Sequence, residues 1–220
     1  MDNEIQRIDT GSEQWNQLLN GGYETDCITT LYGPAAAGKS TACLLAMAKV
    51  VESGKIAFYI DSEGGFSVDR LRQVAPDIDL SKVIVLRPKD FREQGEFLKN
   101  LPVNKSTGIF VVDTISMYYR IESEKRGRKA LNKELSVQIS YLLDIVRQHR
   151  IPVLIVSQVY ADFDQPNQVK LIGGDLLKVM SKCIIEIQNF KNQRKAIIKK
   201  HRSIEEGKEV MFTIVQYGFE

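Results

Sequence analysis

Residues 33–41, GPAAAGKST, have the types and spacing that bind the phosphates of a nucleotide. Gly33 is followed by four residues and then by Gly38, Lys39 and Ser40, the pattern of a phosphate-binding loop. In such a loop the backbone amides surround the phosphates, and the dipole of the following helix adds its positive end. Lys39 can reach the β- and γ-phosphates, the Ser40 hydroxyl can ligate Mg²⁺, and Thr41 can touch the α-phosphate. The predicted nucleotide-binding residues of the loop are Gly33, Pro34, Ala35, Ala36, Ala37, Gly38, Lys39, Ser40 and Thr41.

The sequence on either side of this loop supports the same function. ITTLY before it is typical of a buried strand, and ACLLAMAKVV after it is typical of a helix. The alternative, a chance match in a turn rich in glycine and alanine, would need neither neighbour. The nucleotide could be hydrolysed to drive work, or it could switch a binding surface on and off.

Three other strand ends carry polar side chains that could complete such a site. Asp113 ends the apolar run GIFVVD, where a carboxylate can hold the water shell of Mg²⁺, although it could instead cap the next turn. Glu63 in FYIDSEGGF could orient an attacking water as a general base, or it could belong to a solvated acidic loop. Gln158 follows VLIVS and could sense the γ-phosphate, or it could be a strand-end amide without a role.

Short apolar runs alternate with longer segments of helical period, which predicts an α/β fold with a mainly parallel central sheet. The expected parallel strands are Ile28–Tyr32, Ile56–Ile60, Val83–Leu86, Ile109–Val112 and Val153–Val156. The expected helices are Lys39–Glu52, Val68–Val74, Phe91–Asn100 and Leu131–Gln148. Three later strands, Cys183–Ile187, Ala196–Lys200 and Val210–Val215, predict an antiparallel extension. Residues 1–220 contain no repeat or linker, so we expect one domain.

The composition is that of an ordinary globular protein. Of the 220 residues 43% are apolar, and the net charge of +2 does not by itself indicate nucleic-acid binding. Cys27, Cys43 and Cys183 have neither disulfide nor zinc spacing and are expected to be buried thiols. The polar start MDNEIQRID lacks a signal-peptide core and no run is long enough to span a bilayer, so we expect a cytoplasmic protein without a membrane partner.

Taken together, these motifs resemble the RecA/RadA recombinase superfamily, and its archaeal paralogues in particular. IDTGSEQWNQLLNGGYETDCITTLYGPAAAGKST is similar to the beginning of the recombinase ATPase core. DSEGGFSVDRL and GGDLLKVMSKCIIEI are similar to later segments of that core, so the resemblance covers nearly the whole chain. It implies a RecA-like P-loop NTPase core that binds ATP and Mg²⁺, the metal being held by Ser40 and, through water, by Asp113.

The resemblance also implies roles for single residues. Glu63 would be the catalytic carboxylate, acting with Lys39, and Gln158 would be the switch between the nucleotide and the DNA loops. Arg70 would stack on the adenine, where the alternative is a solvated helix cation. Because the ATPase-core motifs start at the beginning of this sequence, we expect no N-terminal helix-hairpin-helix domain. The sequence also lacks the family's Phe-x-x-Ala tether, since no phenylalanine has alanine three residues later. We therefore expect weak filament formation.

The basic segment YYRIESEKRGRKALNK, which follows Asp113, is the first candidate for DNA contacts. Cations beside tyrosines favour single-stranded DNA, although two glutamates dilute the charge and the tyrosines could belong to the core. The resemblance makes this segment the first DNA loop. The predicted DNA-binding residues are Arg120, Lys125, Arg126, Arg128 and Lys129. A second DNA loop at 160–174 carries one cation, Lys170, and is a poor candidate by charge.

Residues 187–204 contain no acidic residue and form the second basic segment. Part of it could be a DNA-facing hairpin. Within it, KKHRS resembles the Lys-x-Arg finger of related ATPases, so Lys200 and Arg202 would reach the γ-phosphate of a neighbouring subunit. The alternative is a basic edge strand that opposes aggregation.

Two functions are consistent with these features. The favoured one is an ATP- and DNA-binding recombinase paralogue that assists the main archaeal recombinase, RadA, in homologous recombination and DNA repair, with weak or absent ATP hydrolysis. The alternative is a DNA-stimulated ATPase that acts directly in strand pairing. The intact Lys39, Ser40, Glu63 and Asp113 favour hydrolysis, whereas the missing tether favours the assisting role, because such sites are completed by neighbouring subunits. A homo-oligomer is compatible with both.

Overall fold

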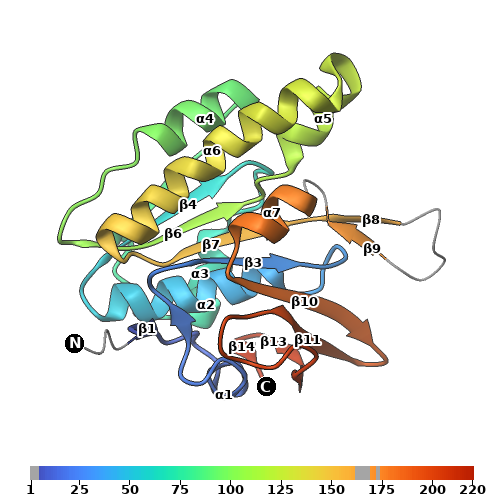
Figure 1. Cartoon of the computed structure of the whole chain (residues 1–220). Coiled ribbons are helices and arrows are strands. Elements are labelled where there is room, and N and C mark those ends of the chain that lie inside the picture. The colour runs from blue at the N-terminus through green and yellow to red at the C-terminus, as the bar shows by residue number, and fades with distance from the viewer. Residues whose placement is uncertain (1–4, 162–168, 172–173) are drawn as a thin grey trace.

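A computed structural model describes residues 5–161, 169–171 and 174–220. Its centre is an eight-stranded sheet in the order β12-β11-β10-β3-β7-β6-β4-β5 (Figure 1). The parallel strands are β3 (Ile28–Tyr32), β4 (Ile56–Asp61), β5 (Val83–Leu86), β6 (Thr107–Asp113), β7 (Val153–Ser157) and β10 (Cys183–Phe190). The strands β11 (Gln193–Lys200) and β12 (Glu209–Phe212) extend the sheet antiparallel from β10. The predicted α/β fold with its antiparallel extension is therefore confirmed.

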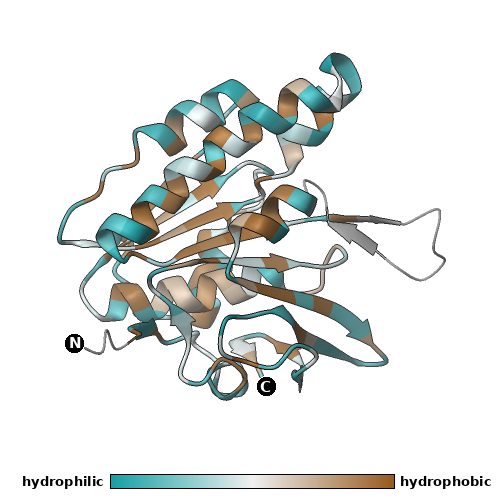
Figure 2. Ribbon diagram, in the orientation of Figure 1, coloured by the Kyte–Doolittle hydropathy of each residue, from teal (hydrophilic) through white to brown (hydrophobic). Residues whose placement is uncertain are grey.

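Helices cover both faces of this sheet. On one face lie α2 (Lys39–Glu52) and α3 (Val68–Val74), and on the other α4 (Phe91–Lys99), α5 (Met117–Arg126), α6 (Arg128–His149) and α7 (Gly174–Met180) (Figure 1). The strands β3, β6 and β7 are buried along their whole length, because apolar side chains on both faces pack against these helices. Figure 2 shows β6 and β7 as largely hydrophobic between helices whose outer faces are largely hydrophilic.

The two ends of the chain meet on the α2 face. The N-terminal part forms β1 (Arg7–Ile8), α1 (Glu13–Leu18) and β2 (Tyr23–Glu24), and the C-terminal part forms the small hairpin β13 (Ile214–Val215) and β14 (Gly218–Phe219). Trp15 of α1 packs with ring centroids 5.6 Å from both Phe212 and Phe219. This aromatic cluster fixes the C-terminal hairpin next to the phosphate-binding loop. The remaining short elements are the 3-10 turn η1 (Leu80–Lys82), β8 (Val159–Ala161) and β9 (Val169–Leu171).

Three expectations need correction or qualification. The strand expected at Val210–Val215 is interrupted, because β12 ends at Phe212 and β13 begins at Ile214. The segment expected as a loop after Asp113 is largely helical, forming α5 and the first turn of α6. The second DNA loop expected at 160–174 lies mostly outside the described residues. Among the helices of the described ranges, none is long and apolar enough to cross a membrane.

Candidate nucleotide and DNA site

The phosphate-binding loop connects β3 to α2, as its sequence predicted. Glycine is required at Gly33 because a Cβ there would lie 2.1 Å from the backbone oxygen of Ile187 in β10. Gly38 precedes α2 with a φ of +104°, and a Cβ on it would lie 3.0 Å from Cδ1 of Ile214. Both glycines therefore let neighbouring chain segments approach the loop closely.

Lys39 is the buried cation of the site, with 7% of its surface exposed. Its Nζ donates hydrogen bonds to the carbonyl oxygens of Gly33 (2.9 Å) and Pro34 (2.6 Å). Burial lowers the pKa of Lys39, while the charges of Asp113 and Glu63 partly oppose this shift. The ammonium group of Lys39 is thus bonded to neutral carbonyl oxygens of the loop. The phosphates of a nucleotide would give it negatively charged partners instead.

Asp113 lies at the end of β6 with 6% of its surface exposed. Its Oδ2 accepts hydrogen bonds from Ser40 Oγ (2.6 Å) and from the Tyr59 hydroxyl (2.5 Å). Burial raises the pKa of Asp113, although Ser40, Tyr59 and Lys39 favour its charged form. A hydroxyl and a carboxylate in direct contact are the oxygen donors that Mg²⁺ uses beside nucleotide phosphates, so these residues fit the metal.

Glu63 is exposed and follows β4, and its Oε1 is bonded by residues that follow two neighbouring strands, β7 and β6. It accepts hydrogen bonds from Gln158 Nε2 (2.6 Å), after β7, and from Thr114 Oγ1 (3.0 Å), after β6. Asp61 shapes the intervening turn by accepting hydrogen bonds from the amides of Gly65 (2.9 Å) and Phe66 (3.2 Å). The sequence-predicted residues Glu63 and Gln158 are therefore brought together, and Asp61 has a structural role.

A cavity of about 590 Å³ opens beside the phosphate-binding loop. Its lining residues are Ala36, Ala37, Gly38, Lys39, Ser40, Thr41, Arg70, Gln73, Ile214, Val215 and Gln216. Arg70 donates to the carbonyl oxygens of Gln216 (2.6 Å) and Val215 (3.1 Å), so it holds the C-terminal hairpin at the cavity wall. The cavity is large enough for a small ligand, and stacking of Arg70 on a base stays a prediction.

The segment predicted as the first DNA loop carries cations on the helix α5 and at the start of α6. Tyr119 is buried and its hydroxyl donates to Asn132 (2.6 Å), while the Tyr118 hydroxyl donates to the carbonyl of Pro88 (2.6 Å). Tyr119 therefore belongs to the core, whereas Tyr118 is half-buried and packs beside it. Lys125 forms a 3.8 Å ion pair with Glu122, and Arg126 pairs with Glu134.

Arg120 and Lys129 of the same segment are exposed. Together with Lys125 and Arg126, they place exposed cations along α5 and the start of α6. The side chain of Arg128 is outside the described part of the structure. The segment therefore offers positive charge for phosphates, while base stacking by the half-buried Tyr118 stays a prediction.

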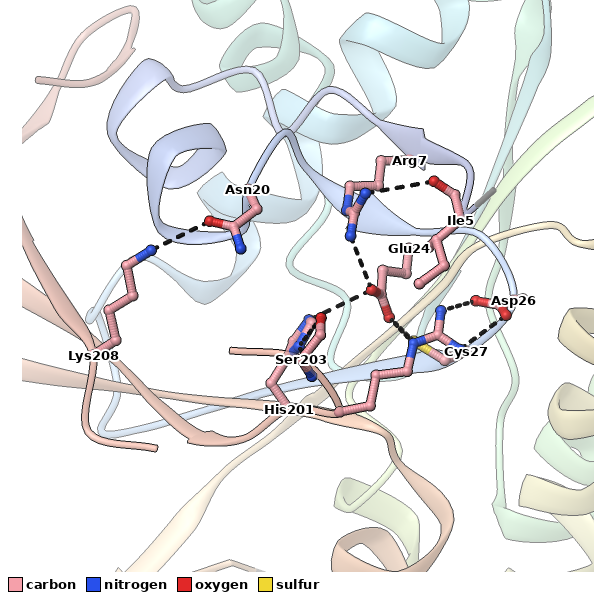
Figure 3. A network of polar contacts seen from close by, with 10 residues as sticks. Ile5, Arg7, Asn20, Glu24, Asp26, Cys27, His201, Ser203 and Lys208 are labelled. Atoms are coloured by element: carbon pink, nitrogen blue, oxygen red, sulfur yellow. Dashed lines mark hydrogen bonds and ion pairs between the residues drawn. The ribbon is translucent and has the colours of Figure 1, made fainter. Parts of the chain in front are cut away.

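Lys200 and Arg202, the predicted finger, lie at the end of β11 that is distant from the phosphate-binding loop. Lys200 is level with Ile184, near the start of β10, whereas the loop follows the end of the neighbouring β3. Arg202 Nε forms a 2.7 Å ion pair with buried Glu24, and its other nitrogens donate to Asp26 at 3.0 and 2.5 Å (Figure 3). Lys200 Nζ donates to the carbonyl of Lys178 (2.5 Å). Any contact of this pair with a nucleotide would have to involve another subunit.

Several residues of the site were missed by the sequence analysis. Tyr59 is one of a run of apolar strand residues, and only the pairing of β4 with β6 brings it beside Asp113. Thr114 gave no signal apart from its position after Asp113. Gln73 and residues 214–216 join the cavity because the C-terminal hairpin folds back over α2, a contact that no local pattern encodes.

Comparison with known proteins agrees with this architecture. A Rad51 family profile matches residues 1–220. The chain is 38% identical to "DNA repair and recombination protein RadB" of Methanococcus maripaludis, covering 93% of this chain and 95% of that protein. It is 35% identical to the RadB protein of Thermococcus kodakarensis, covering 97% and 98%.

Among solved structures, the "Crystal structure of the RadB recombinase" superposes with a TM-score of 0.79 at 32% identity. It covers 97% of this chain and 98% of that chain. The resemblance to RecA-like archaeal recombinase paralogues is thus confirmed across the fold. The chain belongs to the Rad51 family.

Proposed function

We propose that this protein is an ATP- and DNA-binding recombinase paralogue that assists homologous recombination and DNA repair, with weak or absent ATP hydrolysis. The hydrogen bond between Gln158 and Glu63 carries this proposal, because it links the nucleotide side of the sheet to the segment that follows β7. The names of the relatives, which are DNA repair and recombination proteins, support the same process. The protein would act as a switch whose DNA- or partner-binding state depends on nucleotide.

ATP and Mg²⁺ fit the residues at the phosphate-binding loop. Lys39 and the amides of residues 33–41 would hold the phosphates, and Ser40 with Asp113 would hold the metal. Bound ATP with Mg²⁺ would supply the γ-phosphate that distinguishes the two nucleotide states. Ser40 donates its hydroxyl hydrogen to Asp113, which leaves the lone pairs of its oxygen available for the metal.

Glu63 is the residue placed to accept a proton or orient a water. Its Oε1 is engaged by Gln158 and Thr114, whereas Oε2 receives no hydrogen bond from the residues that the structure describes. A change in the position of Gln158 alters the donors to this carboxylate, and the same coupling operates in the reverse direction. This reciprocity is what a switch between nucleotide and DNA requires.

Weak turnover is supported by the position of the finger residues. Arg202 is tied to Glu24 and Asp26 of its own chain and lies at the opposite edge of the sheet from its own Lys39. An isolated subunit therefore brings no arginine of this kind to its nucleotide, and such an arginine is a large part of efficient phosphoryl transfer. Assembly would have to free Arg202 before it could act in trans.

DNA and protein partners would use different parts of the molecule. Single-stranded DNA would contact the cations of α5 and the start of α6, namely Arg120, Lys125, Arg126, Arg128 and Lys129. The strand β5 is an edge of the sheet, and all its residues are half-buried. An edge of this kind can accept an extended segment of a partner chain, such as RadA or a second copy of this protein.

The second candidate function, a DNA-stimulated ATPase in strand pairing, is favoured by the complete set of Lys39, Ser40, Glu63 and Asp113. ATP binding and ATP turnover, measured with and without single-stranded DNA, separate the two functions, with Glu63→Gln as the control. Tight binding with negligible turnover in both proteins supports the switch. A DNA-stimulated rate that disappears in Glu63→Gln would contradict it and establish the ATPase.

A further inference from the structure

The parallel strands begin at the end of the sheet opposite the phosphate-binding loop, and this end carries a row of basic residues. It lies on the left in Figure 1, and the phosphate-binding loop and Glu63 lie at the other end. Basic residues lie just before four adjacent or near-adjacent strands. They are Lys55 before β4, Lys105 before β6, His149 and Arg150 before β7, and Lys182 before β10. All five side chains belong to exposed residues, and we call this set the basic edge.

The basic edge is hollowed where β4, β6 and β7 begin. A cavity of about 330 Å³ is lined by Lys55, Val103, Asn104, Lys105, Thr107, His149 and Ile151. No carboxylate is among these lining residues. Two lysines, a histidine and an asparagine thus line one opening, and side chains of these types can donate hydrogen bonds to an anion.

Lys55 is held in place at this cavity by the fold. A Cβ on Gly108 would lie 2.8 Å from Cβ and 3.2 Å from Cδ of Lys55, so the stem of Lys55 lies directly against the backbone of β6. Packing of the stem limits its freedom while the ammonium group remains at the surface. The absence of a side chain at Gly108 therefore lets both Lys55 and Val50, whose Cγ1 would lie 2.3 Å from such a Cβ, pack against β6.

The basic edge continues past the cavity to Lys182, on the far side of β3. The residue before β3 in this row is the acidic Asp26, whose two oxygens accept hydrogen bonds from Arg202 at 3.0 and 2.5 Å. This pairing compensates the negative charge that would otherwise interrupt the row. From β4 to β10 there are four strand separations, so the row is about 19 Å long at about 4.8 Å per strand.

We propose that the basic edge binds the sugar-phosphate backbone of DNA, as a second contact surface on the side of the sheet opposite the nucleotide site. The row of about 19 Å presents five basic residues, and each of them can contact a phosphate of one DNA strand. The cavity between Lys55 and Lys105 receives one of these phosphates. The contact is independent of base sequence, because the row presents cations and no side chain built to read base edges.

This inference rests on the proposed DNA-binding function and adds a location to it. The predicted contacts on α5 and α6 follow the ends of the strands, whereas the basic edge precedes their beginnings. One molecule can therefore hold two segments of DNA, or two parts of one strand, at the two opposite ends of its parallel strands. A long anionic chain fits a continuous row better than a small anion does, because each added phosphate contact releases further counterions.

Binding of a single-stranded oligonucleotide over a range of salt concentrations tests the basic edge. In the double variant Lys55→Gln/Lys105→Gln we expect weaker binding and a salt slope reduced by about 1.4, from about 0.7 for each of two phosphates that are no longer neutralised. The matched control, Arg72→Gln/Lys89→Gln, removes the same charge from exposed residues outside the basic edge and should keep the wild-type slope. Both variants should keep the wild-type affinity for ATP, which shows that the fold is intact.

Lysine acetylation followed by mass spectrometry provides the second measurement. The oligonucleotide should protect Lys55, Lys105 and Lys182 and leave Lys89 reactive. Equal protection by inorganic phosphate at the same phosphate concentration, or by polyglutamate, would overturn the assignment in favour of a small anion or an acidic protein.

An unchanged salt slope in Lys55→Gln/Lys105→Gln, with wild-type protein still binding DNA, would overturn the basic edge alone. Wild-type protein that binds no DNA would overturn the DNA-binding part of the proposed function. The two failures are therefore distinguishable by the behaviour of the wild-type protein.

Discussion

Gln158 Nε2 lies 2.6 Å from Oε1 of Glu63, although the two residues follow strands that are separated in the sheet by β6. Thr114, at the end of that intervening strand, donates to the same oxygen at 3.0 Å. Three strand ends are thus joined through one carboxylate. Because the segment after Gln158 leads away from the sheet, this contact is a physical path along which nucleotide and DNA can influence one another.

The first prediction concerns this contact. Gln158→Ala should bind ATP with an affinity near that of the wild type, because Gln158 does not line the cavity at the phosphate-binding loop. The effect of ATP on affinity for single-stranded DNA should disappear, and titrations of DNA with and without ATP measure it. Thr114→Val removes the other donor to Glu63 and serves as the control. Equal coupling in Gln158→Ala and wild type would exclude a switch through this amide.

The second prediction concerns the phosphate-binding loop. Lys39→Ala should abolish tight ATP binding, because Lys39 is the only lysine among the residues that line the cavity. Ser40→Ala should weaken binding in Mg²⁺ by about 10- to 100-fold, the value of a hydrogen bond or ligand contact to a charged group. It should have a smaller effect in EDTA, where the metal is absent. Calorimetric titration in both buffers checks this, and an unchanged affinity in Lys39→Ala would refute the assigned site.

The third prediction concerns the cations of α5 and α6. Neutralising Arg126, Arg128 and Lys129 together should weaken binding of single-stranded DNA and flatten its salt dependence by about 0.7 for each phosphate that is no longer neutralised. Arg126 pairs with Glu134, so Glu134→Gln should have the opposite effect and strengthen binding by releasing this cation. A salt slope that stays the same in the triple variant would remove this segment from the DNA site.

The fold was largely predictable because its signals are local. The runs ITTLY, GIFVVD and VLIVS are apolar on both faces, as only a strand covered by helices on each side can be, and each forms a central parallel strand. The segment after Asp113 was harder, because its many charged residues suit either a solvated helix or a loop. There the helix α5 ends at Arg126, before Gly127 with its φ of +80°, and α6 begins directly after it.

The parts of the site that belong to one continuous motif were predictable. The parts formed by segments that are distant in the sequence were not. The spacing from Gly33 to Ser40 identified the loop, and the strand ends identified Asp113, Glu63 and Gln158 as neighbours of it. The partner of Arg202 was not predictable, because Glu24 lies far away in the sequence and carries no motif. A long-range ion pair depends on the register of β10 with β11, which a single sequence does not specify.

The fourth prediction separates stability from catalysis at Arg202. Arg202→Ala removes the 2.7 Å partner of the buried Glu24 carboxylate but leaves its 3.3 Å pair with Arg7, so it should lower the free energy of unfolding by about 2 kcal/mol, the value of a hydrogen bond to a charged group. Adding Glu24→Gln should recover part of this stability, because a neutral amide is cheaper to bury than a carboxylate that has lost one of its two arginine partners. Denaturant unfolding of both variants and the wild type measures the effect. A decrease in ATP turnover in assembled protein, at unchanged stability, would instead support the finger role.

The fifth prediction concerns His201, whose imidazole is 1% exposed and faces Glu24, Arg202 and Arg7 (Figure 3). Burial lowers the pKa of His201, an effect that Arg202 and Arg7 reinforce and Glu24 opposes. In the window below about pH 6.5, the unfolded chain therefore binds a proton that the folded chain does not, and the free energy of unfolding should decrease as the pH falls.

His201→Gln should remove this part of the pH dependence of unfolding. The other histidine of the chain, His149, is exposed, so His149→Gln should keep the wild-type dependence and provides the matched control. Denaturant unfolding at a series of pH values between about 7.5 and 5 checks both variants across the range in which an ordinary histidine titrates. A stability that increases as the pH falls, and that depends on His201, would mean that Glu24 outweighs burial and raises the pKa of His201 instead.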